Sequence, residues 1–222
     1  MHCSAKEGIY EVHYSFDGPD PVKEVTRLGS DASPVPNRTY DGEFFSTSPE
    51  NAFRLVQEGG GAEGSRGYLA LPGDDSDQFY VESTPVWWTP TTTFDLRDTG
   101  ASFYLKELEK VTVAAGYELY LFIAAYIRDT KYLTCWRQQK PLVVGQGEWA
   151  LNRLAIEEDT DQWLCYGCSH PEERPDLNYA LTHCGFFGIM YQNGCEFRQV
   201  HATGVLGLDE LRYNTPLGGR ER

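Results

Sequence analysis

The amino-acid sequence predicts an all-β protein, an antiparallel β-sandwich with at most one short helix. Apolar runs recur about every 8 to 15 residues, and Gly, Pro, Asp, Asn and Ser separate them, as in sandwich proteins. Residues Ala101 to Leu105 alternate apolar and polar side chains, as a half-buried strand does, and the turn residues RDTG precede them. Residues 106–119 contain helix formers, but β-branched side chains and Gly116 interrupt them, so any helix there is short.

Strands are predicted where apolar or aromatic residues alternate, or run together, between turn-forming residues. The first run, IYEVHYSF, alternates large and polar side chains, and the short runs after residue 50 lie between Gly-rich and Asp-rich segments. The predicted strands span residues 9–16, 52–57, 67–71, 78–82, 101–105, 118–128, 132–138, 148–155, 184–192, 196–203 and 204–214.

Two hairpins follow from the turn chemistry. Asn193-Gly194 is the dipeptide that best satisfies a tight hairpin turn, so it predicts pairing of residues 184–192 with 195–203. The short polar link 128–131 joins residues 118–128 to 132–138. Loops are expected at 18–41, 58–66 and 169–176, and the glycines of 58–66 favour flexibility.

The chain of 222 residues is long enough to bury one substantial core. No internal repeat and no linker divides it, so we expect a single domain over residues 1–222. Residues 1–40 would form an N-terminal strand followed by an arm.

The formal net charge of −14 would repel a polyanion, so nucleic-acid binding is not expected. The longest apolar run, LYLFIAAYI, is too short to cross a bilayer, so membrane insertion is not expected either. The N-terminus has no visible signal peptide.

The six cysteines leave several interpretations open. The motif CYGC at 165–168, with Cys184 and Cys195 or with His170 and His183, allows a zinc site, but zinc sites usually have two close ligand pairs. Disulfides are a second alternative, and free thiols are the default expectation.

No motif for nucleophilic catalysis or for phosphate binding occurs in the sequence. Glycoside hydrolysis needs two carboxylates facing one bond, and Glu82, Glu118 and Glu196 lie singly on predicted strands. A catalytic role is therefore less favoured than a binding role.

The order FDLR, SFYL, YELYLFIAAY, CWRQ, GEWALNRLAI, GFFGIMYQNG and GVLGLDELRY resembles the jelly-roll sandwich of galactose-binding-like and laminin-type carbohydrate-binding modules. The resemblance covers about residues 45–214, and only GVLGLDEL is close to a family signature. It implies a jelly-roll fold and a glycan or polysaccharide as the partner.

The resemblance also implies a structural calcium ion held by acidic residues of the last and first strands. In this sequence those positions are Asp209, with Glu210 as its neighbour, and Asp17. The match at Asp17 is loose, because the loop DGPDPVKE lacks a glutamate at the position where such modules usually have one.

Sugar binding in such modules uses aromatic rings on which pyranose faces stack. Adjacent strand residues point to opposite sides, so at least one of two neighbouring tryptophans is expected at the surface. Core packing is the better expectation for Trp136, Trp149 and Trp163. The candidate ligand-binding residues are Trp87, Trp88, Tyr126, Trp136 and Trp163.

The leading prediction is a non-catalytic carbohydrate-binding or surface-recognition module. A structural or adhesion protein of a virion or cell-surface assembly, which would self-associate, is the first alternative, and a polysaccharide-acting enzyme is the second. An extracellular or virion-surface location fits the first two. The fold alone does not decide among them.

If Trp87 and Trp88 form the platform, Trp87→Ala or Trp88→Ala will abolish retention on a glycan without unfolding the protein, because the stacking face is lost. A glycan array together with a thermal unfolding curve measures both effects. Unchanged retention in both variants would contradict a platform in this segment.

Overall fold

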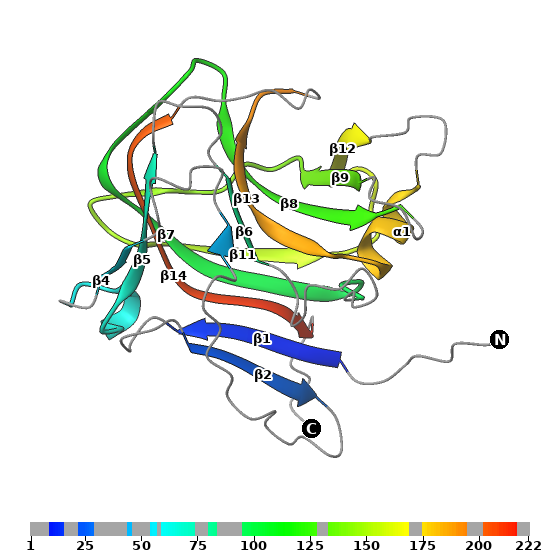
Figure 1. Cartoon of the computed structure of the whole chain (residues 1–222), viewed down its shortest axis with the longest axis horizontal. Helices are drawn as coiled ribbons and strands as arrows, with labels where there is room; N and C mark the ends of the chain where they lie inside the picture. The colour runs from blue at the N-terminus through cyan, green and yellow to red at the C-terminus, as the bar shows by residue number, and fades with distance from the viewer. Residues whose placement is uncertain are drawn as a thin grey trace.

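The protein forms two facing β-sheets in a computed structural model that describes residues 9–15, 22–28, 44–45, 54–56, 59–73, 80–83, 95–127, 133–168, 175–194 and 202–216. Figure 1 shows the two layers: strands labelled β1, β2, β7 and β14 belong to one sheet, and those labelled β8, β9, β12 and β13 belong to the other. Among the described residues, no helix is long and apolar enough to cross a membrane. The predicted all-β sandwich is confirmed.

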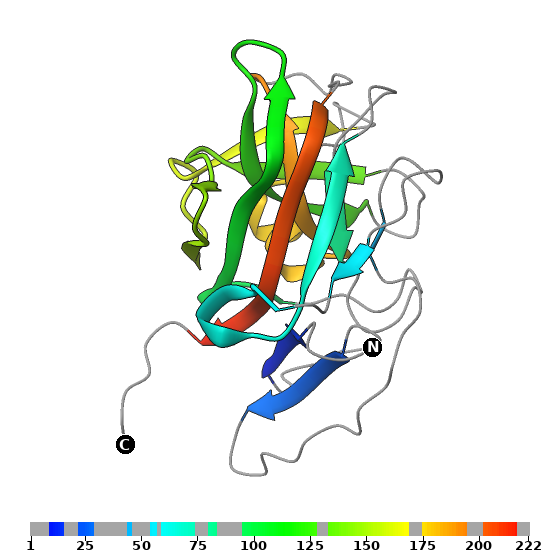
Figure 2. The same cartoon turned by 90° about the vertical axis from the view of Figure 1, so that its left-hand side faces the viewer.

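Sheet A is built around two long strands, β7 (Thr99–Val113) and β14 (Ala202–Pro216). They pair antiparallel from Thr99 opposite Pro216 to Val113 opposite Ala202. Figure 2 faces this sheet and shows these two strands and β5 side by side. The pairing is antiparallel except where β10 lies parallel to β7. The strands of sheet A are β1 (Ile9–Ser15), β2 (Val22–Leu28), β4 (Arg54–Val56), β5 (Tyr68–Gly73), β7 (Thr99–Val113), β10 (Gly145–Gln146), β11 (Ala150–Ile156) and β14 (Ala202–Pro216).

Sheet B has the strand order β12-β9-β8-β13-β6-β3, and every pair in it is antiparallel. Its central strands β8 and β13 pair over seven residues, from Phe186 opposite Ala124 to Gln192 opposite Glu118. The strands of sheet B are β3 (Phe44–Phe45), β6 (Tyr80–Ser83), β8 (Glu118–Tyr126), β9 (Leu133–Gln138), β12 (Trp163–Cys168) and β13 (Phe186–Gln192).

The core lies between the two sheets and follows the period of two along each strand. Sheet A contributes Phe103, Leu105 and Tyr213, which are fully buried. Sheet B contributes Leu121 and Ile123, and the Phe187 ring stacks on the Tyr213 ring with centroids 4.6 Å apart. One continuous hydrophobic cluster therefore joins the sheets.

The helical prediction was wrong in position. Residues 106–113 continue β7, because their pairing with β14 extends to Val113, and the β-branched residues at 111–113 suit a strand. The helix is α1 (Leu177–Thr182), which lies between the expected loop 169–176 and the strand predicted from residue 184. Asp176 caps it by accepting the Tyr179 N–H at 2.8 Å, and Leu177 and Leu181 are buried in the core.

Of the two predicted hairpins, the β8–β9 hairpin is confirmed. For the second hairpin, residues 187–190 of β13 pair with β8 on one side and with β6 on the other, so they do not pair with the chain after Gly194; residues 195–201 of the predicted partner lie outside the described residues. Strand β14 begins at Ala202 and belongs to sheet A. Four strands were not predicted: β2 lies within the expected loop 18–41, β12 contains the CYGC motif, and the two-residue strands β3 and β10 lie between predicted elements.

The glycine-rich segment 59–67 packs against sheet A, whereas its composition predicted flexibility. It includes a 3-10 turn at Ala62–Gly64, and Ala62 is buried. The Gly59 N–H donates to the Arg66 carbonyl, and the Trp149 indole N–H donates to the Gly60 carbonyl at 2.7 Å. Tertiary contacts therefore override the entropy of the glycines here.

Two leucines of adjacent strands provide a test of the core assignment. Leu105 is fully buried, and Leu151 is 37% exposed on the other face of sheet A. We expect Leu105→Ala to lower the free energy of unfolding by about 2 to 5 kcal/mol, because it leaves a cavity. Leu151→Ala, the matched control, is expected to cost less than about 1 kcal/mol. Urea unfolding of both variants measures the difference, and equal losses would contradict this sandwich.

Candidate functional site

The outer face of sheet B carries large apolar side chains where solvent-facing polar residues would be usual. On β8, the side chains of Leu119, Leu121 and Ile123 belong to the core between the sheets. Because neighbouring residues of a strand point to opposite faces, Tyr120, Phe122 and Tyr126 lie on the outer face. Sheet B is therefore apolar on both sides.

A second hydrophobic cluster, separate from the core, forms at this face. It consists of Phe122, Tyr166 and Met190, with Cys135 packed against it, and these residues come from β8, β12, β13 and β9. The register of β12 shifts between Cys165 and Gly167, at Tyr166. Cys165 packs against the core, and Tyr166 points to the other side and joins this cluster. We call the set of outer-face residues Tyr120, Phe122, Tyr126, Arg137, Tyr166, Phe186 and Met190 the aromatic face.

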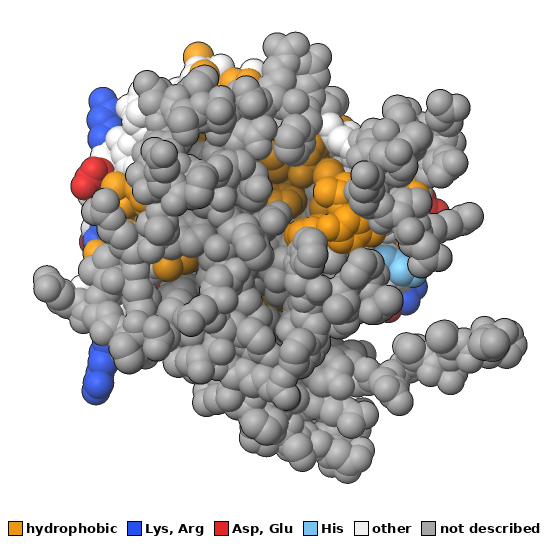
Figure 3. Space-filling view, viewed as in Figure 1, with side chains coloured by type: hydrophobic (Ala, Val, Ile, Leu, Met, Phe, Trp, Pro, Cys, Tyr) orange, Lys and Arg blue, Asp and Glu red, His pale blue; other side chains and the backbone are white. Residues whose placement is uncertain are grey.

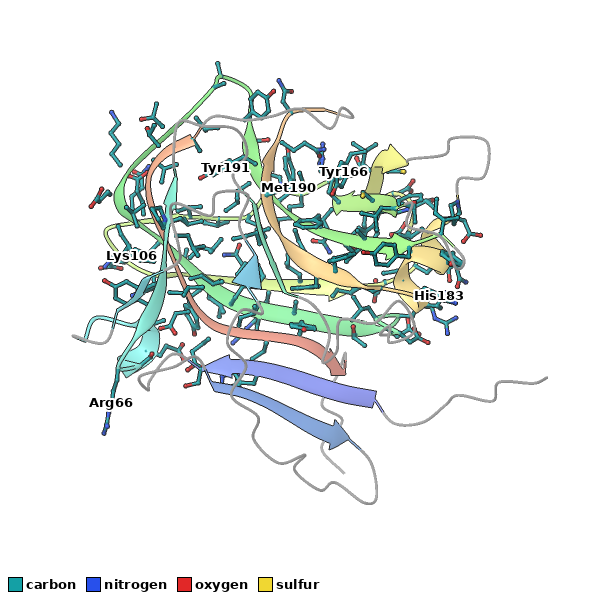
Figure 4. All side chains as sticks on the ribbon, viewed as in Figure 1. Arg66, Lys106, Tyr166, His183, Met190 and Tyr191 are labelled. Carbon is teal, nitrogen blue, oxygen red and sulfur yellow. The ribbon has the colours of Figure 1, made fainter. Side chains whose placement is uncertain are left out.

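Hydrophobic side chains are visible near these strands in the space-filling view. Figure 3 shows hydrophobic side chains in the middle of the molecule, over the region where Figure 1 places β8 and β13. Figure 4 shows Tyr166 and Met190 side by side in projection, near the upper ends of the strands of sheet B. Phe122, Tyr166 and Met190 are 5 to 7% exposed, so they form the floor of the face.

Arg137 is the cation of the aromatic face and is 5% exposed. Its guanidinium lies 3.9 Å from the centroid of the Tyr120 ring. Nη1 donates to the Gln138 carbonyl at 2.9 Å and Nη2 to the Gly194 carbonyl at 3.1 Å, while Nε is buried without a hydrogen-bond partner in the described part of the chain. No ion pair among the described residues includes Arg137, although buried charges are usually paired.

Tyrosine hydroxyls and carbonyls fix the edges of the face. The Tyr120 hydroxyl donates to Glu118 at 2.9 Å, and burial together with this hydrogen bond raises the pKa of Tyr120. At the other end the Tyr179 hydroxyl of α1 donates to the Tyr126 carbonyl at 2.9 Å, and the Tyr126 ring lies 5.5 Å from the Phe186 ring. The rings are therefore held in place before any ligand arrives.

The sequence-predicted aromatic residues divide into three groups. Tyr126 is half-buried on the aromatic face. Trp136 and Trp163 lie in the core at 7% and 2% exposure, so the structure corrects their candidacy as surface platforms and confirms the core expectation for them. Their indole nitrogens donate to the Thr134 hydroxyl and the Glu157 carbonyl. Trp87 and Trp88 lie outside the described residues.

Two of the predicted acidic residues, Asp209 and Glu210, lie on strand β14 of sheet A. Asp209 is fully buried beneath segment 59–67, where its carboxylate accepts the Ala62 N–H at 2.7 Å and the Glu210 N–H at 2.8 Å. Burial raises the pKa of Asp209 to about 6, although these N–H groups lower it in part. Glu210 contacts His13 of β1 at 2.7 Å and Arg212 at 3.2 Å. Asp17 lies outside the described residues.

The cysteines of the described segments show no metal cluster. Cys184 is a free thiol, and burial raises its pKa to about 12. Among the described residues, no group of three or more His, Cys, Asp or Glu side chains could hold a metal ion. Cys3 and Cys195 lie outside these residues.

Sequence reasoning missed most of the aromatic face, although one signal was present. In YELYLFIAAY the aromatic residues at positions 120, 122 and 126 alternate with the core residues of β8, and this period places them on one face. Arg137, Tyr166 and Met190 carry no such signal, because strand order and the irregularity in β12 bring them there.

Comparison with known proteins was made at the levels of sequence and fold. No protein-family model matches the chain, and no curated protein matches it. Among solved structures, CtCBM11, studied in solution, superposes with a TM-score of 0.50 at 12% sequence identity, covering 81% of this chain and 92% of that chain.

Two further structures are similar over most of their length. The family 11 carbohydrate-binding module from Clostridium thermocellum in complex with a β-1,3-1,4-mixed-linked tetrasaccharide has a TM-score of 0.49 at 9% identity, covering 95% of this chain and 99% of that chain. CBM27-1 from Caldicellulosiruptor saccharolyticus in complex with mannohexaose has a TM-score of 0.34 at 11% identity, covering 79% and 92%. The two-sheet topology and the likeness to CtCBM11 show that the chain has a jelly-roll β-sandwich fold.

Proposed function

We propose that this protein is a non-catalytic carbohydrate-binding module and that the aromatic face of sheet B binds the glycan. The observation that carries the proposal is the separate cluster of Phe122, Tyr166 and Met190 on the side of the sheet that does not form the core. A sandwich needs one apolar face per sheet, and this cluster is a second one; its members are buried, and Tyr126 is the half-buried ring through which we propose that a ligand makes contact.

The chemistry of the face suits a sugar ring. The C–H faces of a pyranose stack on aromatic rings, and desolvation of both surfaces supplies much of the binding energy. The guanidinium of Arg137 lies over the Tyr120 ring and supports it from within the face. The net charge of −14 favours a neutral glycan over a polyanionic one.

The two alternative functions have less support. A glycoside hydrolase would need two carboxylates facing one bond. On the described part of the aromatic face, one carboxylate, Glu118, has a recorded contact, the hydrogen bond that it accepts from Tyr120. A self-associating surface protein predicts an oligomer in light scattering. Neither alternative accounts for the cation that lies beside the rings of this face.

Tyr126→Ala tests the proposal, because Tyr126 is the half-buried ring of the face and makes its interstrand ring contact at the rim. We expect affinity for a retained neutral polysaccharide to fall about tenfold, or ~1.4 kcal/mol, because one stacking surface is lost. Affinity electrophoresis in gels containing soluble glucans, mannans, xylans or galactans measures it.

The matched control is Tyr117→Ala, which removes a half-buried tyrosine in the turn before β8, next to the core rather than on the aromatic face. It should leave affinity unchanged. Equal affinity of the wild type and Tyr126→Ala, with both folded, would contradict binding at this face, and no retention by any of the four polysaccharide classes would contradict the carbohydrate-binding function.

We also propose a structural calcium ion near Asp209, with Glu210 and Asp17 as further candidate ligands. The Ser65 hydroxyl, the Asp209 carboxylate and the Gly67 carbonyl converge beside Gly61, where each oxygen would lie 2.7 to 2.8 Å from an added Cβ. Carboxylate, hydroxyl and carbonyl oxygens are the hard donors that Ca²⁺ prefers. In the described structure the Ser65 hydroxyl donates to the Gly67 carbonyl and Asp209 accepts the Ala62 N–H, so a bound ion would replace these hydrogen bonds. The ion would stabilise segment 59–67 against β14.

Calcium binding should raise thermal stability. At a Ca²⁺ concentration about 100-fold above Kd, we expect the Tm to exceed that in chelator by about 5 to 10 °C, because ligand binding stabilises the folded state. Asp209→Ala should remove the difference, whereas Asp161→Ala, which alters an exposed aspartate, should keep it. Identical unfolding curves of the wild type with calcium and with chelator would contradict the site.

A further inference from the structure

The outer face of sheet A carries a second group of aromatic side chains. Tyr68 and Tyr104 each neighbour a core residue in sequence, Leu69 and Leu105, so their own side chains lie on the opposite side of the sheet. Trp149, next to the start of β11, packs against Gly207 on this same side, because Leu206 and Leu208 occupy the core side of β14. This face points away from the aromatic face of sheet B (Figure 2).

Gly207 allows the indole of Trp149 to approach the sheet. A Cβ added at Gly207 would lie 2.7 Å from Cη2 and 3.2 Å from Cζ3 of the indole, so any larger residue would push the ring away. The indole N–H donates to the Gly60 carbonyl at 2.7 Å, and the Tyr68 ring meets the indole edge-on at 5.4 Å. The ring is therefore fixed on three sides and half-buried, which leaves part of it exposed to solvent.

A cation lies over this ring, and further polar groups lie on the same face of sheet A. The Lys106 ammonium lies over the indole, 5.8 Å from the ring centroid. Figure 4 shows Lys106 on the same side of the molecule as Arg66 of segment 59–67. Burial and a hydrogen bond with Glu63 raise the pKa of Tyr104 to about 12, and Arg153 lies close enough to act on the same group. A fixed aromatic surface with donors and acceptors around it is the composition of a sugar-binding subsite.

We propose that Trp149 forms a second glycan-binding subsite on the outer face of sheet A. The indole supplies the stacking surface, Tyr68 supports its edge, and the Lys106 ammonium donates a hydrogen bond to a hydroxyl oxygen of the stacked sugar. The proposal rests on the proposed function for its class of ligand, and it adds a site on the opposite side of the sandwich. Two such sites would let one molecule bridge two chains of a polysaccharide, which increases avidity.

A protein partner fits this face less well than a glycan. Large protein interfaces need a continuous apolar core, and Leu151 is the exposed large hydrophobic residue of the described part of this face. One fixed ring with charged and hydroxyl groups around it suits a ligand of the size of a single sugar ring.

The indole N–H resonances of the full-length protein, labelled with [15N]tryptophan, test the subsite without any substitution. The Trp149 signal is assigned with Trp149→Phe, and the buried Trp136 and Trp163 serve as internal controls. During titration with neutral hexasaccharides of glucose, mannose, xylose and galactose, we expect the Trp149 signal to shift and saturate with one of them while both control signals stay in place. No shift of the Trp149 signal with any hexasaccharide would overturn the proposal.

Retention measurements on polysaccharide gels separate the two sites. Trp149→Ala is expected to weaken retention about tenfold, and Lys106→Met about threefold, with cooperative unfolding preserved. The double variant Trp149→Ala/Tyr126→Ala should lose retention altogether. If Trp149→Ala does not fold, Lys106→Met and the titration of the wild-type protein carry the test.

Each combination of results decides something different. If only Tyr126→Ala weakens retention and the Trp149 signal is still, the proposed function stands and the second subsite is overturned. If only Trp149→Ala weakens retention and its signal shifts, the second subsite stands and the aromatic face of sheet B is the wrong location. If no glycan is retained and no signal shifts, both proposals fail.

Discussion

The two-sided burial of the central strands β8 and β13 is the constraint on which the rest of the structure depends. Leu121, Ile123, Phe187 and their neighbours pack between the sheets, and they hold sheet B against sheet A. The alternate residues Phe122 and Met190 form a separate apolar cluster on the outer face. Because the period of two ties these faces together, a slip of one residue in the β8–β13 register would exchange core and surface together. The fold and the candidate site therefore depend on the same strand register, so a register shift that changed the site would also disrupt the core.

The charged groups are placed by the same sheets. Arg137 alternates with the core residue Trp136 on β9, so it lies on the outer face, where its guanidinium stacks on Tyr120 and binds the carbonyls of Gln138 and Gly194. A buried cation without an ion pair among the described residues is costly for folding alone, and ligand recognition supplies a reason to retain it. On sheet A, segment 59–67 packs over Asp209 and receives the indole N–H of Trp149. One contact set thus links the proposed calcium region to the proposed second subsite.

Much of the fold could be predicted from sequence, because alternation and turn residues are local signals. Strands such as β1, β8 and β9 matched their patterns closely, and the β8–β9 hairpin followed from a short polar link. The Asn193-Gly194 signal did not reveal the neighbours of β13, because strand order is decided by long-range pairing, and residues 187–190 of β13 use both edges for β8 and β6. Tyr126 was identified from its sequence context, but Arg137, Tyr166 and Met190 meet only after distant strands pair. Trp149 was expected in the core, because composition does not reveal that Gly207 leaves room for a ring on the outside.

The central claim is that the outer face of sheet B contacts a glycan, and Met190 reports on it directly. The sequence contains two methionines, Met1 and Met190, so protein labelled at the methionine methyl groups gives one resonance from the floor of the aromatic face. The account predicts that the Met190 methyl resonance shifts saturably with a neutral oligosaccharide, at the same concentrations that release the protein from the matching polysaccharide. A Met190 resonance that does not move while the protein is released by that oligosaccharide would contradict the account, because binding would then take place elsewhere.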